Sequence, residues 1–315
     1  MRPRWMPLAL LLVGAGYAIA ASPDPDPTST FEPTPVRHET LVAVGNICGN
    51  PVACKNTANR AIETDADLVL TLGDMAYDDG LLSEFRYRYG GAWGRHELRS
   101  ITVPGFGNHD CYDEGAKRGC EDAGAYFGPD TSFGDDIAGT TGSYSIVRGD
   151  WLIVVLNSAG DGGSGRATPA EIASQDEGLL DVLLADQHTC EIVAWHHPRF
   201  SSGRDGGRAT FVTPWVETAY ANGVDVILNA HHHHYERFAP QDPEGSPGGE
   251  GVREFVVGTG GAPLEAFGQP ARNSEARFTQ WGILEMDLAS NGTYSWAFVD
   301  DMTAGVFDEG ADVCH

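Results

Sequence analysis

The amino-acid sequence predicts a layered α/β domain, and three observations carry this prediction. Short, continuous apolar runs recur along the chain, as expected for strands that are buried on both faces. A helix with clear boundaries lies between two of these runs. Near the C-terminus the pattern changes to the alternation of an antiparallel hairpin. Strands that alternate with helices are typical of a sheet covered by helices.

The individual elements follow from local patterns. The apolar runs predicted as strands are residues 41–44, 67–72, 101–106, 151–156, 192–195, 224–228 and 254–257. The helix begins after Thr168, which forms a capping box with Glu171 and is followed by Pro169 at the first helical position. The hairpin joins residues 283–288 to 293–299 and turns at Asn291-Gly292.

The length and the net charge of the chain limit its number of domains and its partners. The 315 residues, 41% of them hydrophobic, suffice for one large domain or two small ones with a buried core. Forty-five acidic residues against 20 basic ones give a net charge of -25. Such a surface repels phosphate backbones, so nucleic acid is not expected as a partner. Forty glycines and 18 prolines predict long loops, where functional sites tend to lie.

The N-terminus predicts export. Residues 1–20 are expected to be a signal peptide, because Arg2 and Arg4 precede an apolar run that ends in Ala18-Ile19-Ala20. A retained membrane anchor is the alternative, which the shortness of the run disfavours. Residues 21–37 are rich in Pro and Asp and predict an extended linker. The mature protein is therefore expected to be secreted, extracellular or periplasmic, and free of the membrane after signal removal.

The even number of cysteines favours three disulfides in an exported chain. Short loops close easily, which favours pairing Cys48 with Cys54 and Cys111 with Cys120, and leaves Cys190 for Cys314. Metal ligation by cysteine is the alternative, and the lack of a CxxC pair disfavours it.

Oxygen- and nitrogen-bearing side chains follow the ends of most predicted strands. They are Asn46 after the first strand, Asp74 after the second, Asn108 and His109 after the third, His196 after the fifth, and His231 and His233 after the sixth. Loops at the carboxyl ends of strands in α/β sheets converge on the functional site, so these side chains are expected to meet in space.

Asp, Asn, His and Tyr without cysteine form a ligand set that suits iron, manganese or zinc. The donors are too many for one tetrahedral ion, whereas two ions bridged by a carboxylate would use them all. Such a pair binds both the attacking and the leaving oxygen of a phosphoryl transfer. Asp74 is the expected bridge, because Gly73 lets the chain turn tightly there.

Four motifs in order resemble those of the calcineurin-like metallophosphoesterases. They are Gly73-Asp74-Met75-Ala76-Tyr77, Gly107-Asn108-His109-Asp110, His196-His197-Pro198 and the run from His231 to Arg237. The Asp-x-x-Tyr and His-x-His-x-Tyr-Glu-Arg forms are most similar to the purple acid phosphatase branch, here of a secreted bacterial type. The resemblance implies a four-layer αββα sandwich with two mixed β-sheets. It places the catalytic domain at residues 38–303 and leaves 304–315 as a tail held by Cys314.

The resemblance also implies roles. Asn46, Asp74, Tyr77 and His233 would bind the first metal, and Asp74, Asn108, His196 and His231 the second. The ions would be two divalent metals or iron with a divalent metal, drawn from Fe, Zn and Mn. A metal-bound hydroxide would hydrolyse a small phosphate ester, as in acid phosphatases. His109 would contact the substrate and stabilise or protonate the leaving oxygen.

The sequence departs from the family pattern at three places. Asn46 stands where the family has aspartate, so the first metal loses a compensating carboxylate. Ala230 replaces a glycine before the histidine run. In the loop where the plant-type branch carries substrate-side histidines, this chain has Arg204 and Arg208. Either arginine is a candidate for binding phosphate, and a solvated loop arginine is the simpler interpretation.

Simpler interpretations stay open for other positions as well. Tyr77 is a ligand or a core tyrosine beside Met75, Asn108 a ligand or a turn residue, and Cys48 a disulfide partner or a metal ligand. His232 and His234 are expected to face away from His231 and His233, because side chains alternate along an extended segment. Two other functions remain: a weakened family member that binds metal or a phosphorylated ligand, favoured by Asn46, and an extracellular metal-sequestering protein.

Overall fold

The computed structural model describes residues 35–111, 120–128, 135–136, 142–204 and 208–315. All described helices and strands belong to one compact unit, Val36–His315. The expected signal peptide, residues 1–20, lies outside the described residues, as does the expected linker except for residues 35–37. Among the described residues, none of the helices combines the length and the apolar character that crossing a membrane requires.

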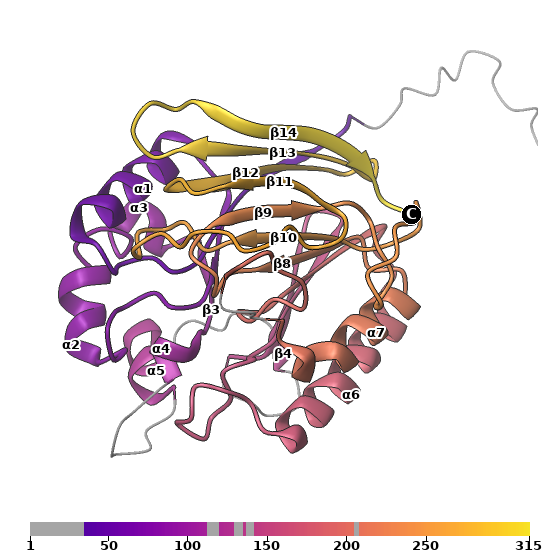
Figure 1. Ribbon diagram of the computed structural model, residues 1–315, viewed down its shortest axis with the longest axis horizontal. Coiled ribbons are helices and arrows are strands. Elements are labelled where there is room, and N and C mark those ends of the chain that lie inside the picture. Colours follow the sequence, from indigo (N-terminus) through magenta and orange to yellow (C-terminus); the bar gives the residue numbers. More distant parts are fainter. Residues whose placement is uncertain (1–34, 112–119, 129–134, 137–141, 205–207) are drawn as a thin grey trace, which may run out of the picture. The chain divides into compact units, whose positions relative to one another are not determined.

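The first sheet has six strands in the order β14-β13-β12-β1-β2-β3. Its parallel strands are β1 (His38–Val44), β2 (Leu68–Leu72) and β3 (Thr102–Gly105). Antiparallel strands extend it on the other side of β1: β12 (Gly282–Ala289), β13 (Thr293–Asp300) and β14 (Val306–Val313). The three antiparallel strands lie together in Figure 1.

The second sheet has eight strands in the order β11-β9-β10-β8-β7-β6-β5-β4. Its central strands are parallel: β6 (Trp151–Val155), β7 (Cys190–Ala194), β8 (Val226–Asn229) and β10 (Arg253–Val257). Its outer strands are antiparallel: β4 (Asp135–Asp136), β5 (Tyr144–Arg148), β9 (Tyr235–Phe238) and β11 (Ser274–Phe278). Both sheets are therefore mixed.

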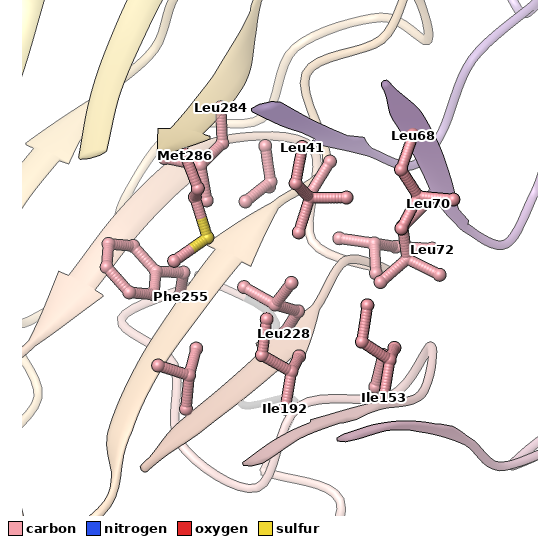
Figure 2. Close-up of a cluster of buried hydrophobic side chains, with 14 of the residues drawn as sticks. Leu41, Leu68, Leu70, Leu72, Ile153, Ile192, Leu228, Phe255, Leu284 and Met286 are labelled. Carbon is pink, nitrogen blue, oxygen red and sulfur yellow. The ribbon is translucent and has the colours of Figure 1, made fainter. Parts of the chain in front are cut away.

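Side chains from both sheets fill the space between them. Leu41 of β1 and Leu70 of β2 belong to the same buried cluster as Ile192 of β7 and Leu228 of β8, and all four are fully buried. Figure 2 shows these side chains between the strands of the two sheets. Because side chains alternate along a strand, the residues between them point to the outer faces.

Helices cover both outer faces. On the first sheet, Val42 shares a buried cluster with Ala58 and Ala61 of α1 (Pro51–Glu63). On the second sheet, Val154 shares one with Leu179 of α6 (Pro169–Ala185) and Trp215 of α7 (Thr213–Ala221). The shorter helices are α2 (Leu82–Glu84), the π-helical turn η1 (Phe85–Tyr89), α3 (His96–Arg99), α4 (Asn108–Cys111), α5 (Glu121–Phe127) and the 3-10 turn η2 (Thr210–Val212). The layers run helix, sheet, sheet, helix, and the predicted αββα sandwich is confirmed.

Most elements predicted from the sequence form within a few residues of the expected bounds. The capping box at the start of α6 is present: the Glu171 amide donates to Thr168 Oγ1 at 3.3 Å, and the Thr168 amide donates to Glu171 Oε2 at 2.7 Å. The predicted C-terminal hairpin forms as β12 and β13. Five strands were not predicted from the sequence: β4, β5, β9, β11 and β14.

The three disulfides join the cysteines that the sequence favours: Cys48–Cys54, Cys111–Cys120 and Cys190–Cys314. The last spans 124 residues and ties the end of the chain to the first residue of β7. The segment 304–315 contains β14, which pairs with β13 along its length.

Candidate metal centre

Loops from both sheets bring the predicted donors together at the carboxyl ends of the parallel strands. From the first sheet, Asn46 follows β1, Asp74 follows β2 and Asn108 follows β3; from the second sheet, His196 follows β7, and His231 and His233 follow β8. Tyr77 lies three residues beyond Asp74. The structure brings all seven of these donors into one hydrogen-bonded cluster.

Asp74 lies at the middle of this cluster. Its carboxylate is 1% exposed, and Oδ2 is 3.2 Å from the Tyr77 hydroxyl, which donates to it, and 3.2 Å from His196 Nε2. The other oxygen, Oδ1, accepts from the His109 amide at 2.8 Å. One carboxylate therefore faces donors from both sheets, as a bridging ligand must.

One half of the cluster consists of Asp74, Asn108, His196 and His231. Asn108 Oδ1 is 2.9 Å from His231 Nδ1 and 3.1 Å from His196 Nε2, and these two ring nitrogens are 3.3 Å apart. Ligand atoms of Asp74, His196 and His231 all lie within 4.8 Å of one another. This spacing suits a single cation held by all four side chains.

The other half contains Asn46, Tyr77 and His233 beside the same carboxylate of Asp74. His233 Nε2 is 3.4 Å from the Tyr77 hydroxyl oxygen. Asn46 Nδ2 donates to that oxygen at 2.8 Å and to Asp74 Oδ2 at 3.1 Å. Asn46 Oδ1 is buried and has no hydrogen-bond partner among the described residues. A half turn of the amide would exchange the two atoms and present the oxygen to a cation.

Backbone carbonyls fix which nitrogen of two histidines is available. His196 Nδ1 is 2.7 Å from the Leu72 carbonyl oxygen, and His233 Nδ1 is 2.7 Å from that of Pro263. A carbonyl accepts only, so Nδ1 carries the proton in both rings and Nε2 is directed into the cluster. Partners of this kind orient metal-binding histidines.

Close packing of the backbone requires glycine beside the carboxylate. A Cβ on Gly73, whose φ is +87°, would lie 2.6 Å from the Gly107 nitrogen, and a Cβ on Gly107 would lie 2.3 Å from Asp74 Oδ1. Asp74 itself has a φ of 54°. The tight turn expected at Gly73 is therefore present, and it brings the β2 and β3 loops into contact.

Asp110 holds these two loops together, a role that the sequence did not reveal. Its buried carboxylate accepts from the amides of Met75, Ala76 and Gly107 at 2.9, 3.3 and 3.0 Å. Burial, together with the nearby charge of Asp74, raises the pKa of Asp110 to about 7.

Burial and neighbouring charges shift the pKa values of the side chains in the cluster. Burial alone would raise the pKa of Asp74, but the neighbouring His196 outweighs it and holds the pKa well below the usual range. Burial would lower the pKa of His196, and the carboxylate of Asp74 outweighs that effect and raises it. Burial, followed by the charge of His196, lowers the pKa of His231 to about 3. Neutral His231 and ionised Asp74 thus lie beside the Asn108 oxygen, and all three side chains carry atoms that can coordinate a cation.

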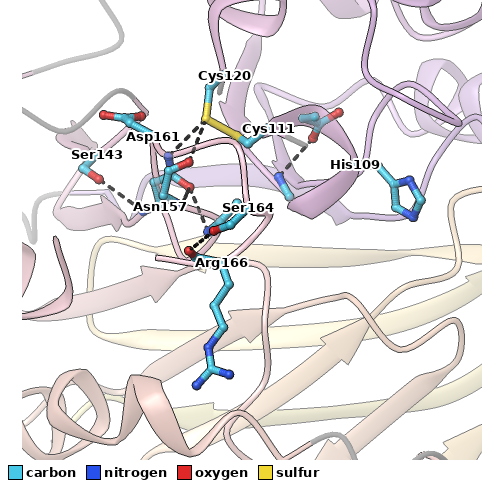
Figure 3. Close-up of a disulfide and its surroundings, with 12 residues drawn as sticks. His109, Cys111, Cys120, Ser143, Asn157, Asp161, Ser164 and Arg166 are labelled. Carbon is cyan, nitrogen blue, oxygen red and sulfur yellow. Dashed lines mark hydrogen bonds between the residues drawn. A yellow bond between two sulfur atoms is a disulfide. The ribbon is translucent and has the colours of Figure 1, made fainter. Parts of the chain in front are cut away.

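His109 lies at the edge of the cluster. Its ring centroid is 4.5 Å from that of Tyr77, and its Nδ1 is 2.6 Å from the Asp78 carbonyl oxygen. Because that carbonyl accepts, Nδ1 carries a proton and Nε2 is the atom available for exchange with a substrate. Figure 3 shows His109 beside the Cys111–Cys120 disulfide.

The hydrogen bonds that join the seven donors do not involve the remaining predicted positions, although the His232 ring lies 5.3 Å from that of His231. Arg204 is exposed, and no contact among the described residues joins it to the donors; Arg208 is exposed as well. His232 and His234 are buried, and their rings stack on each other with centroids 5.6 Å apart. Cys48 is in a disulfide and so is not a metal ligand. Asp225 lies near Cys190 and Cys314, but those sulfurs are bonded to each other.

His197 lies beside the proposed centre, although no role was predicted for it from the sequence. Its ring lies 4.4 Å from that of His231, and its Nδ1 is 2.9 Å from Ser158 Oγ. Burial, followed by the charges of His231 and His196, holds its pKa well below the usual value. His197 therefore packs against a predicted ligand as a neutral ring.

Comparison with known proteins agrees with this geometry. The model of one protein family, described as calcineurin-like phosphoesterase, matches residues 40–235 of the chain. These residues include Asn46, Asp74, Asn108, His196 and His233. A search of curated proteins finds no match.

Solved structures share the fold at low sequence identity. The purple acid phosphatase PPD1 from seeds of yellow lupin (Lupinus luteus) is similar with a TM-score of 0.67 and 19% identity, covering 88% of this chain and 54% of that one. GAP50, the anchor in the inner membrane complex of Plasmodium, gives 0.64 and 12%, covering 88% and 89%. A dimetal phosphatase from Danio rerio gives 0.53 and 11%, covering 88% and 99%. The chain thus spans about half the length of the lupin protein.

Proposed function

The chain belongs to the calcineurin-like phosphoesterase family, and from this premise we propose that it hydrolyses phosphate esters at a centre that binds two metal ions. The observation that carries the proposal is the position of Asp74. Its Oδ2 atom lies 3.1 Å from Asn46 Nδ2 and 3.2 Å from the Tyr77 hydroxyl, both in loops of the first sheet. The same atom lies 3.2 Å from His196 Nε2, in a loop of the second sheet.

Two sets of residues would hold the ions. Asn46, Asp74, Tyr77 and His233 surround the first position, and Asp74, Asn108, His196 and His231 the second. When bound, such a pair lowers the pKa of water and offsets the negative charge of the phosphate. The donors suit Fe, Zn or Mn, and we propose either two divalent ions or iron with a divalent ion.

His109 would assist the leaving group. With Nδ1 held by the Asp78 carbonyl, the proton that the ring delivers sits on Nε2. Transfer of that proton to the ester oxygen turns the departing group into a neutral alcohol. The contact of His109 with Tyr77 keeps the imidazole at the edge of the centre, where a substrate can reach it.

We further propose that the protein is secreted and similar to purple acid phosphatases. Three disulfides are compatible with an oxidising compartment, and Tyr77 lies beside the first metal position, as the resemblance implies. The export signal at residues 1–20, the linker at 21–37 and the catalytic domain at 38–303 remain part of this proposal.

Substitution of Asp74 tests the function. Asp74→Ala removes the shared ligand, so hydrolysis of 4-nitrophenyl phosphate should fall by at least about a thousandfold and bound metal should decrease, with the far-UV circular dichroism unchanged. Asp181→Ala, on the exposed side of α6, is the matched control and should change neither quantity. Retention of most activity by Asp74→Ala would contradict the two-metal centre.

A weakened family member is the second candidate, favoured by the Asn46 amide that points its nitrogen at Asp74. It predicts metal binding without turnover in the presence of Fe, Zn or Mn. A metal-sequestering protein predicts metal uptake that Asp74→Ala leaves unchanged. Metal analysis of the purified protein together with the same assay separates the three functions.

A further inference from the structure

A cleft of about 840 Å³ lies between the start of α6 and the start of α7. Its walls are largely apolar and include Pro169, Ile172, Ala173, Phe211 and Pro214. Small-molecule sites typically have volumes of about 300–1,000 Å³ and apolar walls with a few polar groups. The cleft therefore has the size and lining of a site for an organic group.

The cleft begins beside the metal centre. The Phe211 ring, which lines the cleft, lies 5.5 Å from the His197 ring, and His197 lies 4.4 Å from the ring of His231. The loop before α6 makes a second connection: a Cβ on Gly165 would lie 3.1 Å from Asn108 Cβ. A ligand with its phosphate on the metals thus has the cleft next to it.

Arg166 lies at the boundary between the two. Its guanidinium carbon is 4.1 Å from the centre of the Phe211 ring, and it forms no ion pair with a described carboxylate. Figure 3 shows its side chain extending away from the disulfide of the neighbouring loop. A guanidinium presents several N–H donors in one plane and binds phosphate oxygens in pairs.

We propose that this cleft binds the alcohol portion of the substrate and that Arg166 binds its phosphate, so that the preferred substrates are monoesters of uncharged aromatic alcohols. This inference rests on the proposed function. Phe211 and Ile172 offer apolar surface to a ring. Asp176 and Glu177 add carboxylates to the lining, so an organic portion with negative charge would be repelled.

Filling the cleft tests the proposal. We compare kcat/KM for benzyl phosphate and methyl phosphate, two esters of alkyl alcohols with similar acidity. Burial of a phenyl group should favour the benzyl ester by about ten- to a hundredfold in the native protein. Ala173→Trp, which places an indole in the cleft, should bring that ratio close to one. Ala170→Trp, on the same exposed part of α6 but outside the lining, is the control and should keep it.

Two further comparisons separate the parts of the proposal. A carboxylate on the benzyl ring should reduce kcat/KM by about tenfold relative to benzyl phosphate, because it approaches Asp176 and Glu177. Arg166→Gln should lower kcat/KM for the benzyl and methyl esters by the same factor, since it removes a contact with the phosphate. An unchanged benzyl-to-methyl ratio in Ala173→Trp would overturn the assignment of the cleft.

Binding of phosphonates distinguishes this inference from the proposed function. Benzylphosphonate should bind the metal-loaded protein at least about tenfold more tightly than methylphosphonate in calorimetry, and Ala173→Trp should abolish that difference. If the protein hydrolyses neither ester but retains this preference, the proposed function fails and the cleft assignment stands. If it hydrolyses both esters equally well and binds both phosphonates equally, the cleft assignment fails alone.

Discussion

Asn46 contributes a neutral amide to the proposed centre, where the other ligands that we propose for the first position are a carboxylate, a phenol and an imidazole. Its Nδ2 donates to Asp74 and Tyr77, while its Oδ1 is left without a partner among the described residues. An amide oxygen brings no negative charge to offset a trivalent ion. The first position should therefore prefer a divalent ion and hold it less tightly than a site with a second carboxylate would.

Restoring the carboxylate tests this charge argument. Asn46→Asp should raise metal occupancy of the first position after dialysis by about one ion per chain, as read by elemental analysis. With iron, and with Tyr77 as a ligand, a visible charge-transfer band should appear. Asn291→Asp, in the exposed hairpin turn, is the control. A native protein that is already purple with two tightly held ions, and unaltered by Asn46→Asp, would show that the amide suffices.

His109→Ala should separate proton transfer from metal binding. The His109 ring contacts the predicted metal donors only through the tilted ring of Tyr77, so metal content should stay unchanged. Loss of the acid should slow alkyl phosphates by about 10²- to 10⁴-fold and 4-nitrophenyl phosphate far less, because nitrophenolate leaves without a proton. His96→Ala, an exposed histidine on α3, should change neither rate. Equal losses on both substrates would remove this role from His109.

The sequence predicted the donors but not the groups that orient them. Asp74, Asn108 and His196 could be found because each follows an apolar strand. The Leu72 and Pro263 carbonyls, which fix two imidazoles, have no side-chain signature, since every residue carries a carbonyl. Arg166, which we propose as a phosphate ligand, was not predicted because its position beside Phe211 depends on how the loop before α6 folds back onto η2.

At the level of elements, continuous apolar runs identified the central parallel strands well. Such strands are buried on both faces, so most of their residues are apolar for the same reason. Edge strands do not obey this rule: β14 alternates half-buried and exposed residues and contains three acidic ones, and β11 has no fully buried residue. Their pairing is decided by the neighbouring strand, which a local pattern does not reveal.

Glu254 on β10 should make the stability of the fold depend on pH. Burial, opposed by a backbone hydrogen bond from Phe200, raises the pKa of Glu254 to about 8 from its ordinary 4.5. Because the pKa is higher in the folded than in the unfolded state, the contribution of Glu254 to the free energy of unfolding is fully present below about pH 4.5. It is lost as the pH rises toward 8, with a slope of up to about 1.4 kcal/mol per pH unit. Glu254→Gln should remove this dependence.

Urea unfolding at pH 5 and pH 8 measures the effect. The fall in unfolding free energy between the two pH values should be smaller in Glu254→Gln than in the native protein, whereas Glu217→Gln, exposed on α7, should leave it unchanged. If the free energy of unfolding has the same pH dependence in all three proteins, the pKa of Glu254 is not raised in the folded state.

For the whole molecule, the Cys190–Cys314 disulfide joins the end of the chain to the second sheet. By the loop-entropy relation, a closed loop of this length contributes up to about 5 kcal/mol, against about 2 kcal/mol for the short loop between Cys48 and Cys54. The Cys190→Ala/Cys314→Ala double variant should therefore melt at a lower temperature than the Cys48→Ala/Cys54→Ala variant.

The same double variant should keep its metal and its rate at low temperature. Cys190 begins β7, whereas the predicted metal donor His196 follows the last residue of that strand, so the disulfide and the proposed centre lie at opposite ends of β7. Differential scanning calorimetry gives the order of the melting temperatures, and elemental analysis gives the metal content. Loss of metal in this variant would show that the disulfide supports the centre itself.

The donors of the centre come from both sheets, and this has a thermodynamic consequence. A cation held between Asp74 and His196, as we propose, would join one sheet to the other and would bind only to the folded protein. The ion would then stabilise the folded state. At a free concentration of about one hundred times its dissociation constant, it would add about 2.7 kcal/mol to the free energy of unfolding. A chelator in the buffer should therefore act as a mild denaturant for this protein: it should lower the melting temperature while the covalent structure stays unchanged.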